Sequence, residues 1–138
     1  MAVVNKQFRK RNAILAYLRQ TKSHPSAEMV FNELKQEHPD LSLGTVYRNL
    51  AMFKAQKVIA SIGTVDGIER FDGNTEPHVH FICEGCYKVE DLPKVQVPEE
   101  LYQTVNQQTG GQVVDCHLHF SGVCKDCIAK ELKGGETA

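Results

Sequence analysis

The 138-residue sequence predicts an α+β fold built from two domains, and three observations carry that prediction. Apolar residues recur at helical spacing up to about residue 55, and a hairpin signal, Asp66-Gly67, follows them. Residues 73–77 then interrupt the regular pattern. Beyond them, four cysteines form two CxxC pairs, a spacing typical of zinc-binding modules. We therefore expect an N-terminal domain over residues 1–73, a hinge over 74–77 and a C-terminal domain over 78–138.

The N-terminal domain is predicted to contain three helices and a hairpin. The first helix covers residues 5–20, the second covers 26–37 with Ser26 as its N-cap, and the third begins after Ser42. In each helix the apolar residues share one face; they are Phe8, Ile14, Leu15 and Leu18, then Ala27, Val30, Phe31 and Leu34, then Leu43, Val46, Leu50 and Phe53. Strands are expected near 58–65 and 68–72. This order predicts a winged helix-turn-helix.

The C-terminal domain is predicted to be a small α/β unit. Strands are expected over 78–83 and about 87–92, and Pro98 begins a helix that Gly110-Gly111 ends. A third strand is expected over 113–120, and a short helix follows the second CxxC pair. On this strand Cys116 alternates with Val114, Leu118 and Phe120, so it is predicted to be a small core residue. A reactive thiol is the alternative.

Charge separates the two halves of the chain. Residues 1–72 carry eleven Lys/Arg and seven Asp/Glu, a net +4, whereas residues 73–138 carry five and ten, a net −5. A basic domain followed by an acidic, ligand-rich one fits a nucleic-acid reader joined to a metal-binding module. The sequence contains no signal peptide and no apolar stretch long enough to span a membrane, so we expect a cytoplasmic protein with reduced thiols.

The third helix is the candidate for contact with DNA. Thr45, Arg48, Asn49 and Met52 fall away from its apolar stripe, and Tyr47 lies on the flank. In a major groove, arginine donates to guanine or phosphate, and threonine and tyrosine contact bases or backbone. An ordinary solvated helix face is the alternative, but the adjacent hairpin and the basic charge favour DNA binding.

The cysteine pairs Cys83/Cys86 and Cys124/Cys127 can form a tetrahedral zinc site with four thiolate ligands. The 37 residues between the pairs mean that such a site would join the first strand of the domain to its C-terminal end. Two redox pairs, or cysteines that are merely buried, are the alternatives. Thioredoxin-like chemistry is disfavoured because neither pair is expected to open a helix after a strand in a βαβ unit.

A second ligand group is centred on His78 and His80, which are two residues apart on a strand and therefore share a face. Candidate oxygen ligands are Asp72 and one residue of the adjacent pair Glu90 and Asp91. Imidazoles with carboxylates suit Fe(II), Mn(II) or Zn(II). A partly buried surface pair of histidines is the alternative. Further candidates are His24, from the N-terminal domain, and a less favoured set on the 113–120 strand, Asp115, His117 and His119.

Five stretches of the sequence together point to one family. They are His24-Pro-Ser-Ala-Glu, Gly44-Thr-Val-Tyr-Arg-Asn-Leu, Arg70-Phe-Asp, His78-Val-His-Phe-Ile-Cys-Glu-Gly-Cys and Gly122-Val-Cys-Lys-Asp-Cys. On these motifs the chain resembles the ferric uptake regulator superfamily over nearly its whole length. The resemblance implies a homodimeric winged-helix repressor of double-stranded operator DNA, with a C-terminal dimerisation domain.

The resemblance also implies roles for individual residues. Structural zinc is implied at Cys83, Cys86, Cys124 and Cys127; a regulatory metal is implied at His24, Asp72, His78, His80 and one acidic residue of the following strand; and DNA contact is implied at Tyr47 and Arg48. A metal held by residues of both domains would close the hinge and set the spacing of two recognition helices in a dimer.

The identity of the acidic residue indicates the branch of the superfamily. Counting from the CxxC pair places it at Asp91, and peroxide-sensing members resemble this chain there and at Asp72. The resemblance then implies that bound Fe(II) reacts with hydrogen peroxide and that His24 and His78 are oxidised, with Mn(II) as the other regulatory metal. Pro77, Val79 and Cys116 replace residues that bind an accessory metal in many members.

Three other functions remain open on sequence grounds. The first is an iron- or zinc-responsive uptake repressor of the same superfamily without peroxide sensing. The second is a zinc hydrolase that uses the histidine site, although the sequence has no HExxH-like motif. The third is a zinc-stabilised interaction module that binds no DNA.

Overall fold

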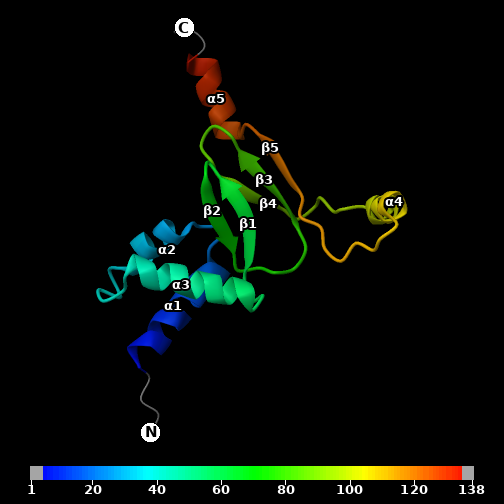
Figure 1. Cartoon of the computed structure of the whole chain (residues 1–138). Coiled ribbons are helices and arrows are strands. Elements are labelled where there is room, and N and C mark those ends of the chain that lie inside the picture. The colour runs from blue at the N-terminus through cyan, green and yellow to red at the C-terminus, as the bar shows by residue number, and fades with distance from the viewer. Residues whose placement is uncertain (1–4, 135–138) are drawn as a thin grey trace. The chain divides into compact units, whose positions relative to one another are not determined.

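The computed structural model of the chain describes residues 5–134. Its internal contacts divide into two compact units, Met1–Glu76 and Pro77–Ala138, and each unit is described by itself. Both units combine helices with a small sheet, so the predicted α+β class is confirmed (Figure 1). None of the helices formed by the described residues is long and apolar enough to span a lipid bilayer.

The first unit contains the helices α1 (Lys6–Gln20), α2 (Ala27–Leu34) and α3 (Leu43–Ala55). Each helix begins at a polar side chain that accepts a hydrogen bond from the main chain three residues later. Asn5 accepts from the N–H of Phe8 at 2.7 Å, Ser26 from residue 29 at 3.2 Å and Ser42 from residue 45 at 3.1 Å. The two serine caps are thus confirmed. Helix α2 ends at Leu34, earlier than the predicted residue 37.

The hairpin of the first unit consists of β1 (Ala60–Val65) and β2 (Ile68–Asp72), which are antiparallel. Asp66 and Gly67 join them with φ values of 53° and 76°, as a two-residue turn with two left-handed residues requires. A bulge interrupts the register between Ser61 and Gly63, where Gly63 has a φ of 100°. The hairpin signal in the sequence is therefore confirmed.

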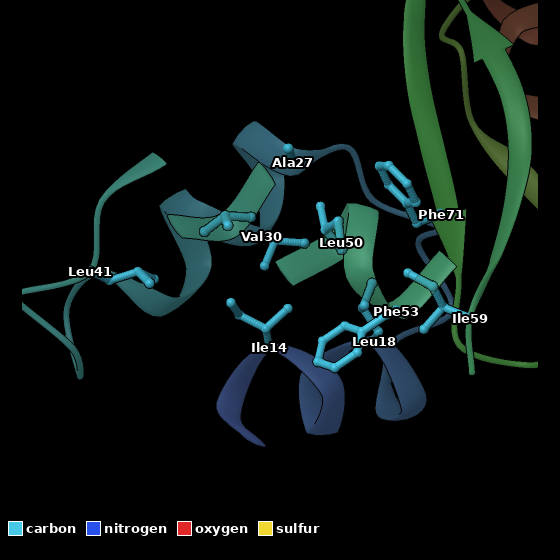
Figure 2. Packing of buried hydrophobic residues seen from close by; sticks show 10 residues of the cluster. Ile14, Leu18, Ala27, Val30, Leu41, Leu50, Phe53, Ile59 and Phe71 are labelled. Atoms are coloured by element: carbon cyan, nitrogen blue, oxygen red, sulfur yellow. The ribbon is translucent and has the colours of Figure 1, made fainter. Parts of the chain in front are cut away.

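The core of the first unit joins the three helices to the hairpin. Figure 2 shows Ile14 and Leu18 of α1 facing Leu50 and Phe53 of α3, with Phe71 of β2 beside them. Ile14 and Leu50 are 0% and 1% exposed. Burial of one such side chain stabilises the fold by about 1.5–3 kcal/mol. The apolar faces of the three helices and of the hairpin are thus buried against one another.

The second unit is built on a three-stranded sheet in the order β4-β3-β5. Strand β3 (Val79–Cys83) runs antiparallel to β4 (Val89–Leu92) and parallel to β5 (His119–Gly122). Helix α4 (Glu99–Thr109) follows β4 and ends at Gly110, whose φ is 69°. Helix α5 (Lys125–Gly134) follows β5 and begins inside the second CxxC pair rather than after it.

The predicted strand over 113–120 is wrong in its first six residues. Strand β5 begins at His119, and Val114 is 95% exposed. Strand β3 supplies partners only as far back as His80, so residues 113–118 lie beyond the paired region. Cys116 is consequently half-buried and not a core residue. It lies with Tyr102 and His78 in the wall of a pocket of about 260 Å³.

Candidate metal centres

The four cysteines of the two CxxC pairs converge in the second unit. Their Sγ atoms all lie within 4.8 Å of one another, and the closest pairs are Cys83 with Cys127 at 3.7 Å and Cys86 with Cys124 at 3.8 Å. Thiolates that bind one zinc ion tetrahedrally at about 2.3 Å are separated by about 3.8 Å. All five cysteines of the chain, which lie within the described residues, are free thiols. The cluster therefore fits a structural zinc ion.

Main-chain groups prepare Cys83 to be a thiolate. Its Sγ accepts hydrogen bonds from the N–H groups of Cys124 at 3.3 Å, Cys86 at 3.4 Å and Gly85 at 3.3 Å. These donors, Cys124 foremost, lower the pKa of Cys83 to about 6. The side-chain hydrogen bond with Cys124, followed by that with Cys83, raises the pKa of Cys127 to about 12. Cys83 therefore loses its proton before Cys127 does. A thiol has to lose its proton in order to bind a metal ion.

Gly85 leaves room for the second cysteine pair. A Cβ atom at this position would lie 3.0 Å from the Sγ of Cys127 and 3.3 Å from its Cβ. Position 85 therefore has to be small for α5 to bring Cys127 to the cluster. The sequence did not single out this glycine.

The second unit also brings His78, His80 and Asp91 together. His80 and Asp91 are directly paired across β3 and β4. The Oδ1 atom of Asp91 lies 3.2 Å from the Nε2 atoms of both histidines, whose ring centroids are 4.3 Å apart. Ligands bound to one ion at about 2.1 Å are separated by about 3.0–3.4 Å, depending on the coordination geometry. The three side chains fit a shared ion such as Fe(II) or Mn(II).

Glu90 does not belong to this group. It is paired with Phe81, and its Oε1 atom accepts from the ammonium group of Lys88 at 2.7 Å. Consecutive strand residues face opposite sides of a sheet, so only one of the two acidic residues can face the histidines. In this structure that residue is Asp91.

The first unit holds the remaining two predicted ligands as a buried pair. The Nδ1 atom of His24 lies 3.4 Å from the Oδ2 atom of Asp72, and the two side chains are 2% and 6% exposed. The other oxygen of Asp72 accepts from the N–H of Asn74 at 2.9 Å, which orients the carboxylate. A buried imidazole and a buried carboxylate are suited to the same hard and borderline metals as the group on β3 and β4.

The loop before α2 holds His24 through contacts with β2. His24 has a φ of 50°, a left-handed conformation that is uncommon for residues other than glycine. Arg70 is only 9% exposed and donates hydrogen bonds to the carbonyl groups of Ser23 and His24. The sequence motif that contains Arg70 predicts no role for it. Three of the five residues of β2 are charged, so the charge of Arg70 alone did not mark it out.

The candidate DNA-contacting residues at the start of α3 differ in exposure. Tyr47 is 51% exposed, and Arg48 is exposed as well. Thr45 is 8% exposed, which contradicts its predicted place on the free face. Its hydroxyl group contacts Ser42 at 2.9 Å and accepts from Arg48 at 3.1 Å, so it supports the arginine side chain. Asn49 donates to the carbonyl of Thr45 at 2.9 Å, and Met52 packs against the core.

The less favoured set of candidate metal ligands, Asp115, His117 and His119, does not form a cluster of three. Asp115 and His117 form an ion pair of 3.0 Å, and their side chains are 66% and 77% exposed. His119 lies on β5 beside His80, as its parallel partner, and is exposed. All three side chains are thus exposed to solvent.

Comparison with known proteins identifies the family. The family model described as the ferric uptake regulator family matches residues 5–121. The peroxide-responsive repressor PerR of Staphylococcus epidermidis is 36% identical over 117 residues, which are 85% of this chain and 77% of that protein.

Solved structures agree with this assignment. The Campylobacter jejuni peroxide stress regulator is 28% identical with a TM-score of 0.73, and the match covers 88% of this chain and 91% of that one. The Francisella tularensis ferric uptake regulator with iron is 25% identical with a TM-score of 0.73, over 92% and 95% of the two chains. The chain therefore belongs to the ferric uptake regulator family, whose members are metal-dependent transcriptional regulators and not enzymes.

Proposed function

We propose that this protein is a metal-dependent repressor that senses hydrogen peroxide through oxidation of its own histidine ligands. His24, Asp72, His78, His80 and Asp91 would hold Fe(II) or Mn(II), and the four clustered cysteines would hold structural zinc. The observation that carries the proposal is the carboxylate of Asp91, 3.2 Å from both histidines of β3. The similarity to the PerR of Staphylococcus epidermidis supports the same assignment.

The proposed signal is a change in the ligands themselves. Bound Fe(II) supplies the reducing chemistry that activates hydrogen peroxide. One oxygen atom of the peroxide is added to a ring carbon of His24 or His78, and the other oxygen leaves as water. The modified ring is a poorer ligand, so the metal affinity falls. Because metal and DNA binding are linked, operator affinity falls with it.

This mechanism predicts a mass change at particular histidines. Fe(II)-loaded protein treated with hydrogen peroxide should gain 16 Da, the mass of one oxygen atom, on the peptides that contain His24 or His78. Peptide mass mapping after anaerobic loading measures this gain, and Mn(II)-loaded protein is the control that should stay unmodified. If neither peptide is modified while Fe(II) is bound, peroxide sensing by this route is excluded, and an iron-responsive repressor becomes the better assignment.

The first unit is proposed to be a winged helix-turn-helix that reads operator DNA as part of a cytoplasmic homodimer. Tyr47 and Arg48 are exposed near the N-terminus of α3, where a recognition helix contacts base edges and phosphates. Thr45 would act indirectly, by holding the guanidinium group of Arg48. The hairpin β1–β2 would be the wing beside the duplex.

Removing the side chain of Arg48 or Tyr47 should weaken operator binding without disturbing metal binding. We expect each change to alanine to cost about 1–3 kcal/mol of binding free energy, measured by mobility shift in Mn(II) at fixed salt. Lys35→Ala removes one exposed positive charge just after the end of α2 and serves as the control for net charge. Equal losses in the arginine and lysine variants would indicate a nonspecific electrostatic effect rather than contact through α3.

A further inference from the structure

We propose that Arg70 is the positioning residue for His24: it holds the loop that presents the His24 imidazole to the regulatory metal. The proposal rests on the proposed function, because it concerns a ligand of that metal. Arg70 would not touch the ion or the peroxide. It would instead set how well His24 binds and how readily that ring is oxidised.

Three consecutive carbonyl groups of the loop accept hydrogen bonds from two consecutive residues of β2. The guanidinium group of Arg70 donates from Nη2 to the Ser23 carbonyl at 2.8 Å and from Nε to the His24 carbonyl. The main-chain N–H of Phe71 donates to the Pro25 carbonyl at 2.9 Å. The loop is therefore attached on both sides of His24, and two of the three bonds come from a single side chain.

The same strand also supplies the carboxylate that faces His24. Residues two apart share one face of a strand, so Arg70 and Asp72 both face this loop. The Oδ2 atom of Asp72 lies 3.4 Å from the Nδ1 atom of His24. Strand β2 thus fixes the main chain of His24 with one residue and contacts its ring with another.

The conformation of His24 requires such support. Its φ of 50° is left-handed, and Pro25 follows it, which further restricts its main chain. The guanidinium fork can donate to two neighbouring carbonyls in a fixed geometry, whereas a lysine ammonium group is a flexible point donor. Arg70 is 9% exposed, so water does not replace either bond readily.

The test is Arg70→Lys, which retains the charge and removes the fork. In zinc-containing protein without regulatory metal, imidazole NMR signals are recorded at one pH and assigned by changing each histidine in turn. We expect the His24 signal to move while those of His78 and His80 stay in place. With Mn(II), the affinity should fall about tenfold. With Fe(II) and peroxide, the ratio of His24 to His78 oxidation should fall, which general destabilisation would not cause.

The matched control is Glu69→Gln on the adjacent residue of β2, whose carboxylate contacts Lys54 at 2.9 Å and Ser61 at 2.6 Å. It should leave the His24 signal unchanged. If the Arg70→Lys protein does not fold, Arg70→Gln is used in its place. An unmoved His24 signal overturns the positioning role whatever the metal data show. If wild-type protein binds no Mn(II), the proposed function fails, and the NMR comparison still decides whether Arg70 positions His24.

Discussion

Replacing Cys124 with serine is expected to unfold the second unit while the first unit stays folded. Over residues 77–131 of this unit, whose burial is described, the buried apolar residues are few: Cys83 and Cys124 with Val79, Ile82 and Val89. A small unit with so little buried surface depends on additional stabilisation. Binding of structural zinc contributes about 10–16 kcal/mol in small zinc domains, which is as much as the total stability of a typical domain.

The experiment compares Cys124→Ser with Cys116→Ser. Metal analysis should find one tightly bound zinc per chain in wild-type protein and in Cys116→Ser, and none in Cys124→Ser. Backbone NMR spectra should lose the dispersed signals of the second unit in Cys124→Ser alone. The signals of residues such as Ile14 and Leu50 should persist, because the core of the first unit contains no cysteine. A Cys124→Ser protein whose second unit remains folded would show that zinc is not its main source of stability.

The elements that sequence analysis located correctly are those whose signals lie within a few residues. Ser26 and Ser42 accept from main-chain groups three residues away, and the Asp66-Gly67 turn depends on its own two φ values. The cysteine cage was also predictable, because the CxxC spacing specifies the ligands of each pair. The sequence did not reveal that Cys83 lies next to Cys127 and Cys86 next to Cys124.

One error concerns a feature that depends on a partner far away in the chain, and the other is local. Alternating apolar residues predicted a strand around Cys116, yet alternation says nothing about a pairing strand, and β5 is paired only from His119 onward. Thr45 was predicted to be free because it lies off the apolar stripe. It is covered by local contacts, because Ser42 and Arg48, each three residues away, both contact its hydroxyl group.

The ligand set shows the same limit. The residue types alone could not tell whether Glu90 or Asp91 faces the histidines, because that depends on the register in which β4 pairs with β3. Arg70 was overlooked because its acceptors precede it by 46 and 47 residues. Local patterns therefore predict which residue types can bind metal, whereas strand register and loop attachment determine which residues face the ion.

Lengthening the carboxylate at position 91 is expected to separate peroxide sensing from metal binding. The Cα atom of residue 91 is fixed opposite His80, so the additional methylene of Asp91→Glu must displace the carboxylate from its place between the two histidines. Glutamate still offers an oxygen ligand, and Mn(II)-dependent operator binding should persist. Oxidation of His24 and His78 by peroxide in Fe(II)-loaded protein should fall about 10- to 100-fold, because such reactions depend steeply on ligand geometry.

The matched control is Glu90→Asp, which removes a methylene from the adjacent residue. Glu90 contacts Lys88 and not the histidines, so peroxide sensitivity should be unchanged in this variant. Peptide mass mapping over a peroxide titration gives the oxidised fraction of each histidine, and mobility shift gives operator release in the same samples. Wild-type sensitivity in Asp91→Glu would mean that the acidic residue does not determine the peroxide response, so the control of oxidation would have to lie with His24 and the loop that Arg70 holds.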